Sequence, residues 1–385
     1  MNFFSKSPDK SISLDSLTEL LDQLRLPTAL VFTPINLASE RKKFFSSSSY
    51  SPQFKYRIVN NNNKKVLAEL SKIQTVTEVD PRISDFYINL IKSKVQANEL
   101  MHAVGQNALF TEIGLKRFRM PSEILFRNAC RAIRGLGDYK IFKDPDGKES
   151  KVYHYDEVAE AFKRVFEYFG LIGWTVNRSQ NIGLNGVKVG IKKQEVLMDP
   201  NIKKRAFALR KTIVHEMTHV LRAYNGSFTG FDALKKPNLP MYLDVEEGLA
   251  GYNEEQMKVF KKKDLIKRAG KVWAAYVSTS MSFREVYNGA MAFAPKYLAF
   301  DIAYRVKRGL SDTSQGGMYT KDVVYFRGYR RVRKKISEDE TLYAKLFAGK
   351  ISFSQIKWVD DGLIPKAKIV PIKSDFDKIF SKIGV

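Results

Sequence analysis

Apolar residues recur every three to four positions along much of the chain, a spacing that predicts helices with one buried face. The pattern is clearest in three segments: residues 82–104, 156–170 and 205–226. In the last segment the apolar positions are Ala206, Leu209, Ile213, Met217 and Val220. Gly226, which follows Asn225, is placed to end that helix. The first hundred or so residues are also predicted to be mostly helical, with Ser16 and Glu19 as a capping box for the first helix.

Short alternating stretches near the middle of the chain predict strands. They are residues 173–178, 185–193 and 195–199. A helix, then a small sheet, then the helix at 205–226 is typical of a mainly helical α+β fold. We predict an N-terminal, mostly helical region over 1–135, which packs on a catalytic domain over 136–385.

The charge balance indicates which partners the chain could attract. Lys and Arg number 65 against 41 Asp and Glu, a net charge of +24, which favours nucleic acid, anionic lipid or acidic peptides. Many of the basic residues fall in short clusters along the sequence. Each such cluster can also be explained as the solvated face of a helix. With one cysteine, Cys130, the chain cannot build a disulfide framework, a thiolate zinc cluster or an iron–sulfur site.

The chain shows neither a secretory signal nor an uncharged apolar run of the roughly 18 residues that a membrane span needs. We therefore expect a cytoplasmic protein without a transmembrane segment.

Chemistry is concentrated in the helix at 205–226, which contains His215-Glu216-Met217-Thr218-His219. Two histidines four residues apart project from the same helix face and can both reach one zinc ion. Glu216 can lie beside a water on that metal and accept its proton. This pattern of five residues also occurs by chance, as a helix with two ordinary histidines and a surface glutamate.

A catalytic zinc site needs a third protein ligand and an open position. Glu247 is the predicted ligand, because small residues share its face of a predicted helix and would allow close packing on the His215 helix. These neighbours are Ala250 and Gly251. Asp244 and Glu246 are the rival ligands, but Asp244 precedes the helix and Glu246 points away from the small-residue face. The remaining histidines, His102 and His154, are interpreted as ordinary surface or core residues.

The combination of HEMTHVLRAYNG with EEGLAGYNE resembles the tyrosine carboxypeptidase family related to the microtubule-associated detyrosinases. Bacterial members of that family are known by a Gln-Glu-Gly-Leu-Ala motif. The resemblance covers most of the chain, because residues 51–54 are similar to the family's Asn-Pro-Gln-Phe region. Residues 311–329 are similar to its segment around Thr-Lys-Asp and a following Tyr.

The resemblance implies a gluzincin-type zinc peptidase core that binds one Zn²⁺. Carried over, the ligands are His215, His219 and Glu247, and Glu216 is the general base. The chain departs from the family in two ways. It has the HExxH spacing where relatives have one more residue between the histidines, and it has Glu246 where many members have Gln. We interpret this extra carboxylate as one that faces solvent.

Further site residues are predicted from the peptidase chemistry. The oxyanion needs a donor besides the metal, and Tyr325 is favoured over four other candidates: Tyr319, Tyr329, Arg305 and Arg327. A substrate carboxylate would be bound by Lys321, or by Arg305 or Arg308. Arg222 and Glu254 are expected to orient the metal ligands. Structural ion pairs are the competing explanation for Lys321 and Arg222.

We therefore expect a zinc carboxypeptidase acting on a peptide or protein C-terminal tail, with Tyr or another aromatic residue as the candidate leaving residue. Eukaryotic relatives act on acidic tubulin tails, and the charge of +24 is compatible with an acidic substrate. Two alternatives stay open: a basic zinc protease associated with nucleic acid, and an inactive member that serves as an interaction module.

Overall fold

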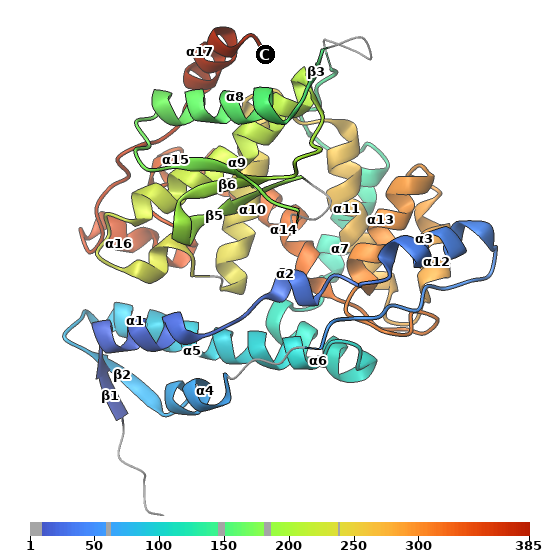
Figure 1. The fold of residues 1–385 in the computed structure, drawn as a ribbon, viewed down its shortest axis with the longest axis horizontal. Helices are drawn as coiled ribbons and strands as arrows, with labels where there is room; N and C mark the ends of the chain where they lie inside the picture. Colours follow the sequence, from blue (N-terminus) through green and yellow to red (C-terminus); the bar gives the residue numbers. More distant parts are fainter. Residues whose placement is uncertain (1–9, 59–62, 145–150, 181–185, 238) are drawn as a thin grey trace, which may run out of the picture. The chain divides into compact units, whose positions relative to one another are not determined.

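The computed structural model describes residues 10–58, 63–144, 151–180, 186–237 and 239–385 (Figure 1). The chain forms two compact units that interleave along the sequence. Unit 1 consists of Met1–Phe126, Asn238–Pro240 and Gly270–Val323, and unit 2 consists of Arg127–Pro237, Met241–Ala269 and Val324–Val385. The grouping differs from the predicted division at residue 135, because helices late in the chain pack with the N-terminal helices. Every helix among the described residues is too short or too polar to cross a bilayer.

Unit 1 is mostly helical, as predicted. Its elements are β1 (Lys10–Ser13), α1 (Leu14–Gln23), α2 (Thr28–Val31), α3 (Leu37–Ser46), α4 (Lys64–Leu70), β2 (Ile73–Thr77), α5 (Pro81–His102), α6 (Asn107–Phe118), α12 (Phe283–Ala290), α13 (Lys296–Lys307) and η3 (Thr320–Val323). Two further helices span the boundary between the units: α7 (Glu123–Ile133) and α11 (Lys262–Val277). Aromatic packing joins early and late parts of the chain, since the Phe44 ring of α3 lies within 5.2 Å of three others. These belong to Phe283, Tyr287 and Phe300.

Two predictions for unit 1 were wrong in detail. The first helix is capped by Ser13, whose side chain accepts a hydrogen bond from the Ser16 backbone N–H at 3.4 Å, so Ser16 lies inside α1. The parallel pair of β1 and β2 was missed, because Ile73 continues the apolar spacing of α4 in sequence but starts β2.

The two segments of unit 1 that resemble the tyrosine carboxypeptidase family lie side by side. Gln53 bridges to Asp312, with Nε2 donating to the carboxylate at 2.8 Å, and the Phe54 N–H donates to the Ser311 carbonyl at 2.8 Å. Residues 53–54 and the start of the 311–329 segment therefore form one local structure.

Unit 2 combines helices with small sheets. Its elements are β3 (Val152–Tyr153), α8 (Tyr155–Tyr168), β4 (Thr175–Arg178), β5 (Val187–Gly190), η1 (Ile191–Lys193), β6 (Glu195–Met198), β7 (Lys204–Arg205), α9 (Ala206–Gly226), η2 (Asp232–Lys235), α10 (Pro240–Gln256), α14 (Val324–Glu338), α15 (Thr341–Leu346), η4 (Phe353–Gln355), α16 (Ile356–Asp360) and α17 (Lys373–Ile383). The main sheet has the order β4-β6-β5, in which β6 pairs parallel with β4 and antiparallel with β5. The three predicted strands are confirmed as β4, β5 and β6, but the second was predicted too long, because Ile191–Lys193 form η1. Asn185, its predicted first residue, lies outside the described residues.

The sheet packs beside α9 through β5, and α8 packs on β4 (Figure 1). All five predicted apolar positions of α9 are buried, so its periodicity does mark the face toward the core. Gly226 ends α9 where a side chain would not fit, because a Cβ there would lie 2.5 Å from the Leu234 carbonyl oxygen. The mainly helical α+β class is confirmed.

Candidate metal centre

The helix α9 presents His215 and His219 one turn apart. Their ring centroids are 4.9 Å apart and the ring planes are nearly perpendicular, at 86°. Both rings are partly exposed, whereas Ile213 and Met217 on the same helix are fully buried. The apolar face of α9 therefore packs in the core, and the two imidazoles lie on its opposite face.

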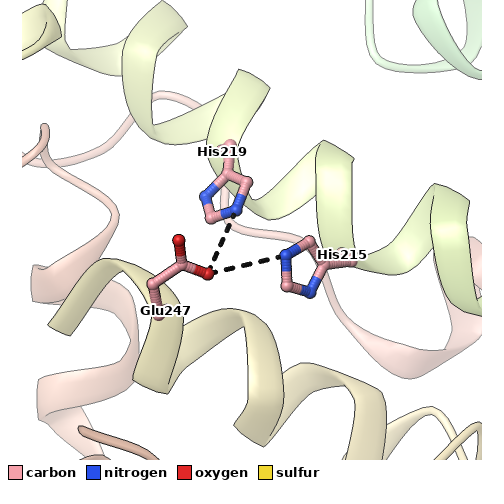
Figure 2. Close-up of side chains that lie close together, drawn as sticks. All are labelled: His215, His219 and Glu247. Carbon is pink, nitrogen blue, oxygen red and sulfur yellow. Dashed lines mark ion pairs between the residues drawn. The ribbon is translucent and has the colours of Figure 1, made fainter. Parts of the chain in front are cut away.

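The third predicted ligand, Glu247, comes from α10. Its Oε2 atom lies 3.7 Å from His215 Nε2 and 3.9 Å from His219 Nε2, between the two rings (Figure 2). One ligand atom from each of the three residues falls within 4.8 Å of the other two. The structure thus brings the predicted set together.

A hydrogen bond between fully buried side chains holds the two helices in register. Asn253 of α10 donates to the Thr218 hydroxyl of α9 at 2.8 Å, next to His219 in sequence. The glycines of α10 allow close packing against residues outside α9. A Cβ on Gly248 would lie 2.4 Å from the Gly328 backbone of α14, and one on Gly251 would lie 2.0 Å from the Arg268 guanidinium. The prediction that Gly251 permits packing on the His215 helix was therefore wrong, since the space is taken by Arg268.

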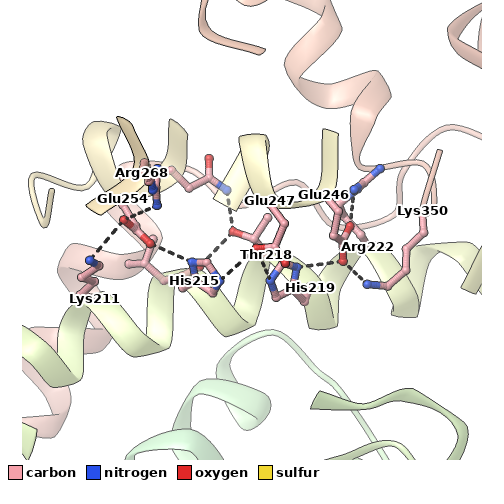
Figure 3. Close-up of polar contacts among 12 residues, drawn as sticks. Lys211, His215, Thr218, His219, Arg222, Glu246, Glu247, Glu254, Arg268 and Lys350 are labelled. Atoms are coloured by element: carbon pink, nitrogen blue, oxygen red, sulfur yellow. Dashed lines mark hydrogen bonds and ion pairs between the residues drawn. The ribbon is translucent and has the colours of Figure 1, made fainter. Parts of the chain in front are cut away.

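Glu254, which was expected to support the metal ligands, lies beside His215. His215 Nδ1–H donates to Glu254 Oε1 at 2.8 Å, which turns Nε2 toward Glu247 (Figure 3). Glu254 is itself buried and held by two cations: Arg268 donates a hydrogen bond at 2.9 Å, and Lys211 forms an ion pair at 3.6 Å. The carboxylate can therefore stay ionised and keep the imidazole oriented.

The interpretation of Glu246 as a solvent-facing carboxylate was wrong. Glu246 is 5% exposed, and its Oε1 atom lies 2.8 Å from His219 Nδ1. Arg222 and Lys350 each form a short ion pair with it (Figure 3). Arg222 was expected to orient a ligand or Glu254, but its carboxylate partner is Glu246. It is fully buried, one turn after His219 on α9.

These neighbours shift the pKa values at the site. Burial alone would lower the pKa of His215, but the Glu254 carboxylate outweighs it and raises the pKa to about 9. Burial alone would raise the pKa of Glu246, yet the charges of Lys350 and Arg222 hold it well below its usual range. Burial raises the pKa of the Glu216 carboxyl, against the opposing effect of the two imidazoles.

The geometry of the three residues fits a divalent cation. The oxygen of Glu247 that faces the imidazoles is buried and forms no hydrogen bond with any described residue. Such an orphaned acceptor is costly unless a ligand satisfies it. Tetrahedral zinc ligands about 2.0–2.1 Å from the metal lie about 3.3 Å apart, slightly less than the distances from Glu247 to the two rings. Two imidazoles and one carboxylate are also donors that zinc accepts.

The other predicted site residues are distributed over both units. Tyr325 lies in the first turn of α14, three residues before Gly328, where that helix touches α10. Two rivals are committed to carboxylates: the Tyr329 hydroxyl donates to Glu255 at 2.9 Å, and Arg327 forms two 2.8 Å hydrogen bonds with Asp244.

Tyr319, another rival, is 1% exposed in an aromatic cluster of unit 1. Lys321 lies in η3, also in unit 1, and Arg305 and Arg308 both pair with Asp322. The roles assigned to these residues stay predictions.

Sequence reasoning missed Lys350. The residue follows α15, in a segment from Leu346 to Ser352 that is buried throughout. A single lysine between Leu346-Phe347-Ala348-Gly349 and Ile351 is the signal that could have found it, because a cation inside an apolar run must be paired if the run is buried.

Comparison with known proteins covers most of the chain. The family model described as microtubule-associated tyrosine carboxypeptidase matches residues 42–378. The microtubule-associated tyrosine carboxypeptidase 1 of Rattus norvegicus is 23% identical over 356 residues, which are 90% of this chain and 64% of the relative. The protein of the same name from Mus musculus is 22% identical over 355 residues, or 90% of this chain and 65% of the relative.

The human protein of that name matches a shorter region, with 28% identity over 159 residues, which are 40% of this chain and 33% of the relative. The chain therefore spans less than two thirds of the rat and mouse relatives it matches. The family match nevertheless extends across both compact units and includes the candidate metal centre. The chain belongs to the microtubule-associated tyrosine carboxypeptidase family.

Proposed function

We propose that this chain is a zinc-dependent carboxypeptidase that removes C-terminal residues, with Tyr as the leading candidate, from peptides or protein tails. The observation that carries the proposal is the unsatisfied Glu247 oxygen facing two oriented imidazoles, with Glu216 next to His215 on α9. The family match supports the exopeptidase class. Two histidines of one helix and a glutamate of the next support a gluzincin-type core.

In this mechanism His215, His219 and Glu247 would hold one zinc ion. Bound zinc would polarise the scissile carbonyl and lower the pKa of a coordinated water. Glu216 takes the proton of the attacking water and returns it to the leaving amine. The raised pKa of Glu216 favours the uptake of that proton, because the carboxylate of a weaker acid is a stronger base.

The remaining roles are assigned to residues with the required donors. Tyr325 would donate a hydrogen bond to the carbonyl oxygen as negative charge develops on it. Lys321 and Arg305 are the candidates for the terminal carboxylate of the substrate. An acidic tail fits the net charge of +24, and a cytoplasmic location stays a prediction.

The test is to incubate the purified chain with a peptide library and identify products by mass spectrometry. We expect loss of single C-terminal residues, which stops on chelation, returns with added zinc and is absent in Glu216→Gln. Peptides with an amidated C-terminus are the control, because they lack the carboxylate and should resist cleavage. Internal cuts, or cuts only with DNA present, would instead favour a nucleic-acid-associated protease. Binding of zinc without turnover would favour an inactive module.

A further inference from the structure

Two carboxylates of α10 stand behind the imidazoles. Glu254 contacts Nδ1 of His215, and Glu246 lies 2.8 Å from Nδ1 of His219. The contact with His215 is a hydrogen bond, whereas the contact with His219 is an ion pair, and His219 Nδ1 is buried without a hydrogen bond to any described residue. Each carboxylate is in turn paired with one arginine and one lysine (Figure 3). The pairs are Arg268 and Lys211 for Glu254, and Arg222 and Lys350 for Glu246.

We propose that Glu246 is a positioning residue for His219, and that Lys350 acts on the metal centre only through Glu246. The inference rests on the proposed zinc site. A carboxylate beside Nδ1 favours the tautomer with its proton on that atom, which leaves Nε2 free to bind metal. Glu246 and Glu247 are adjacent in sequence, so one turn of α10 supplies a ligand and orients another.

A buried carboxylate can do this only if its charge is compensated. Glu246 is 5% exposed and Lys350 2% exposed, so both ions have lost most of their hydration. Arg222 also donates to three backbone carbonyls, those of Leu346 at 2.9 Å, Gly349 at 3.2 Å and Ile351 at 2.5 Å. These bonds fix the segment that carries Lys350 against α9.

The same segment is fixed from a second side. The Lys350 backbone N–H donates to the carbonyl of Leu234 in η2 at 2.8 Å. The backbone around Lys350 is therefore fixed by hydrogen bonds to both Arg222 and Leu234, and this places the Lys350 ammonium beside Glu246. This placement explains why a lysine stands in an otherwise apolar buried stretch.

The test measures zinc affinity by competition with a chelating dye, and the His219 tautomer by ¹⁵N NMR of the zinc-free and zinc-bound full chain. Glu246→Gln should weaken zinc binding by about 10-fold or more and shift His219 toward the Nε2-protonated form. Glu255→Gln is the matched control, because Glu255 is also buried on α10 but accepts a hydrogen bond from Tyr329 and forms an ion pair with Arg333. The control should leave zinc affinity and the His219 tautomer unchanged.

The role of Lys350 is tested by a double-mutant cycle. Lys350→Met should weaken zinc binding in the wild-type background and have no further effect in Glu246→Gln, because its only route to the metal is then absent. Equal effects in both backgrounds would overturn that route. Lys350→Met also serves if Glu246→Gln does not fold, since Arg222 still pairs Glu246 in that variant.

The outcomes separate the two proposals. If the wild-type chain binds no zinc, the proposed function fails. If the wild type binds zinc and Glu246→Gln matches it in affinity and tautomer, the positioning role is overturned while the zinc site stands.

Discussion

Two carboxylates, one in each unit, differ in how their buried oxygens are satisfied. In unit 1, Asp322 is 1% exposed and contacts three cations: Arg308 at 2.9 Å, Lys271 at 3.5 Å, and Arg305 through a short ion pair. In unit 2, Glu247 directs a buried oxygen at two imidazoles without a hydrogen bond to any described residue. The cations around Asp322 satisfy its charge within the fold, whereas the unsatisfied oxygen of Glu247 is the basis of the proposed zinc site.

The contrast extends to the neighbours of Glu247. Glu246 and Glu254 resemble Asp322 because each is buried with cations, but each also contacts an imidazole. If the proposed zinc site is correct, Glu246 and Glu254 would orient its ligands, and Glu247 would bind the metal.

The largest effect is expected from Glu247→Ala. Removing a ligand leaves two imidazoles, which are insufficient for a zinc site with three protein ligands. We expect zinc binding and turnover to be lost while the fold is retained. Metal analysis after dialysis, with circular dichroism as the check on folding, measures this. One tightly bound zinc per chain in the variant would show that Glu247 is no ligand.

Replacing Glu216 with Gln should reduce turnover by about 10²- to 10⁴-fold, the usual contribution of a general base. Zinc content should stay at the wild-type level, because Glu216 is beside the ligand set and not in it. Turnover is followed by release of the C-terminal residue from a model peptide. A variant that keeps full activity would require another base.

Asp322→Asn should destabilise the protein by about 3–5 kcal/mol, because the substitution leaves three cations facing a neutral group in a buried position. Zinc affinity should not change. Urea unfolding gives the free energy of unfolding, and dye competition gives the affinity. A large loss of zinc binding in folded Asp322→Asn would break the distinction between the two carboxylates.

Glu254→Gln should weaken zinc binding by about 10- to 100-fold, as expected when a residue that orients a histidine ligand is changed. The reason is the hydrogen bond from His215 Nδ1, which an amide accepts less strongly than a carboxylate. Dye competition measures the change, with Glu255→Gln as the control from the same helix. Unchanged affinity would remove Glu254 from the centre.

The smallest effect is a pH dependence of stability. Burial alone would raise the pKa of Asp322, but Arg305 and Arg308 hold it well below the usual range. Since the folded-state pKa is depressed, the stabilisation is complete above the ordinary Asp value of about 3.9 and declines as pH falls toward the folded-state pKa. Urea unfolding between pH 3 and pH 7 should therefore show a fall on the acid side that is reduced in Asp322→Asn. Parallel curves for the two proteins would contradict this.

Local patterns predicted much of the chain. The helices α5, α8 and α9 follow from apolar spacing, and the strands β4, β5 and β6 from alternation between turn residues. The parallel pair of β1 and β2 could not be predicted in this way, because its strands are separated by some sixty residues and Ile73 continues the pattern of a preceding helix. Ser13 and Ser16 compete as caps within one turn, and only the backbone conformation at Ser13 decides between them.

The sequence by itself determined the candidate ligands, because helical periodicity alone places residues 215 and 219 on one face and a compact acidic helix follows them. Only the tertiary structure determined the surroundings of residue 246. Its neighbours, Arg222 and Lys350, come from α9 and from a segment more than a hundred residues further along the chain. Whether a carboxylate faces water, a cation or a ligand depends on which residues the fold places beside it. A periodicity of a few residues contains no information about contacts between residues so far apart in sequence.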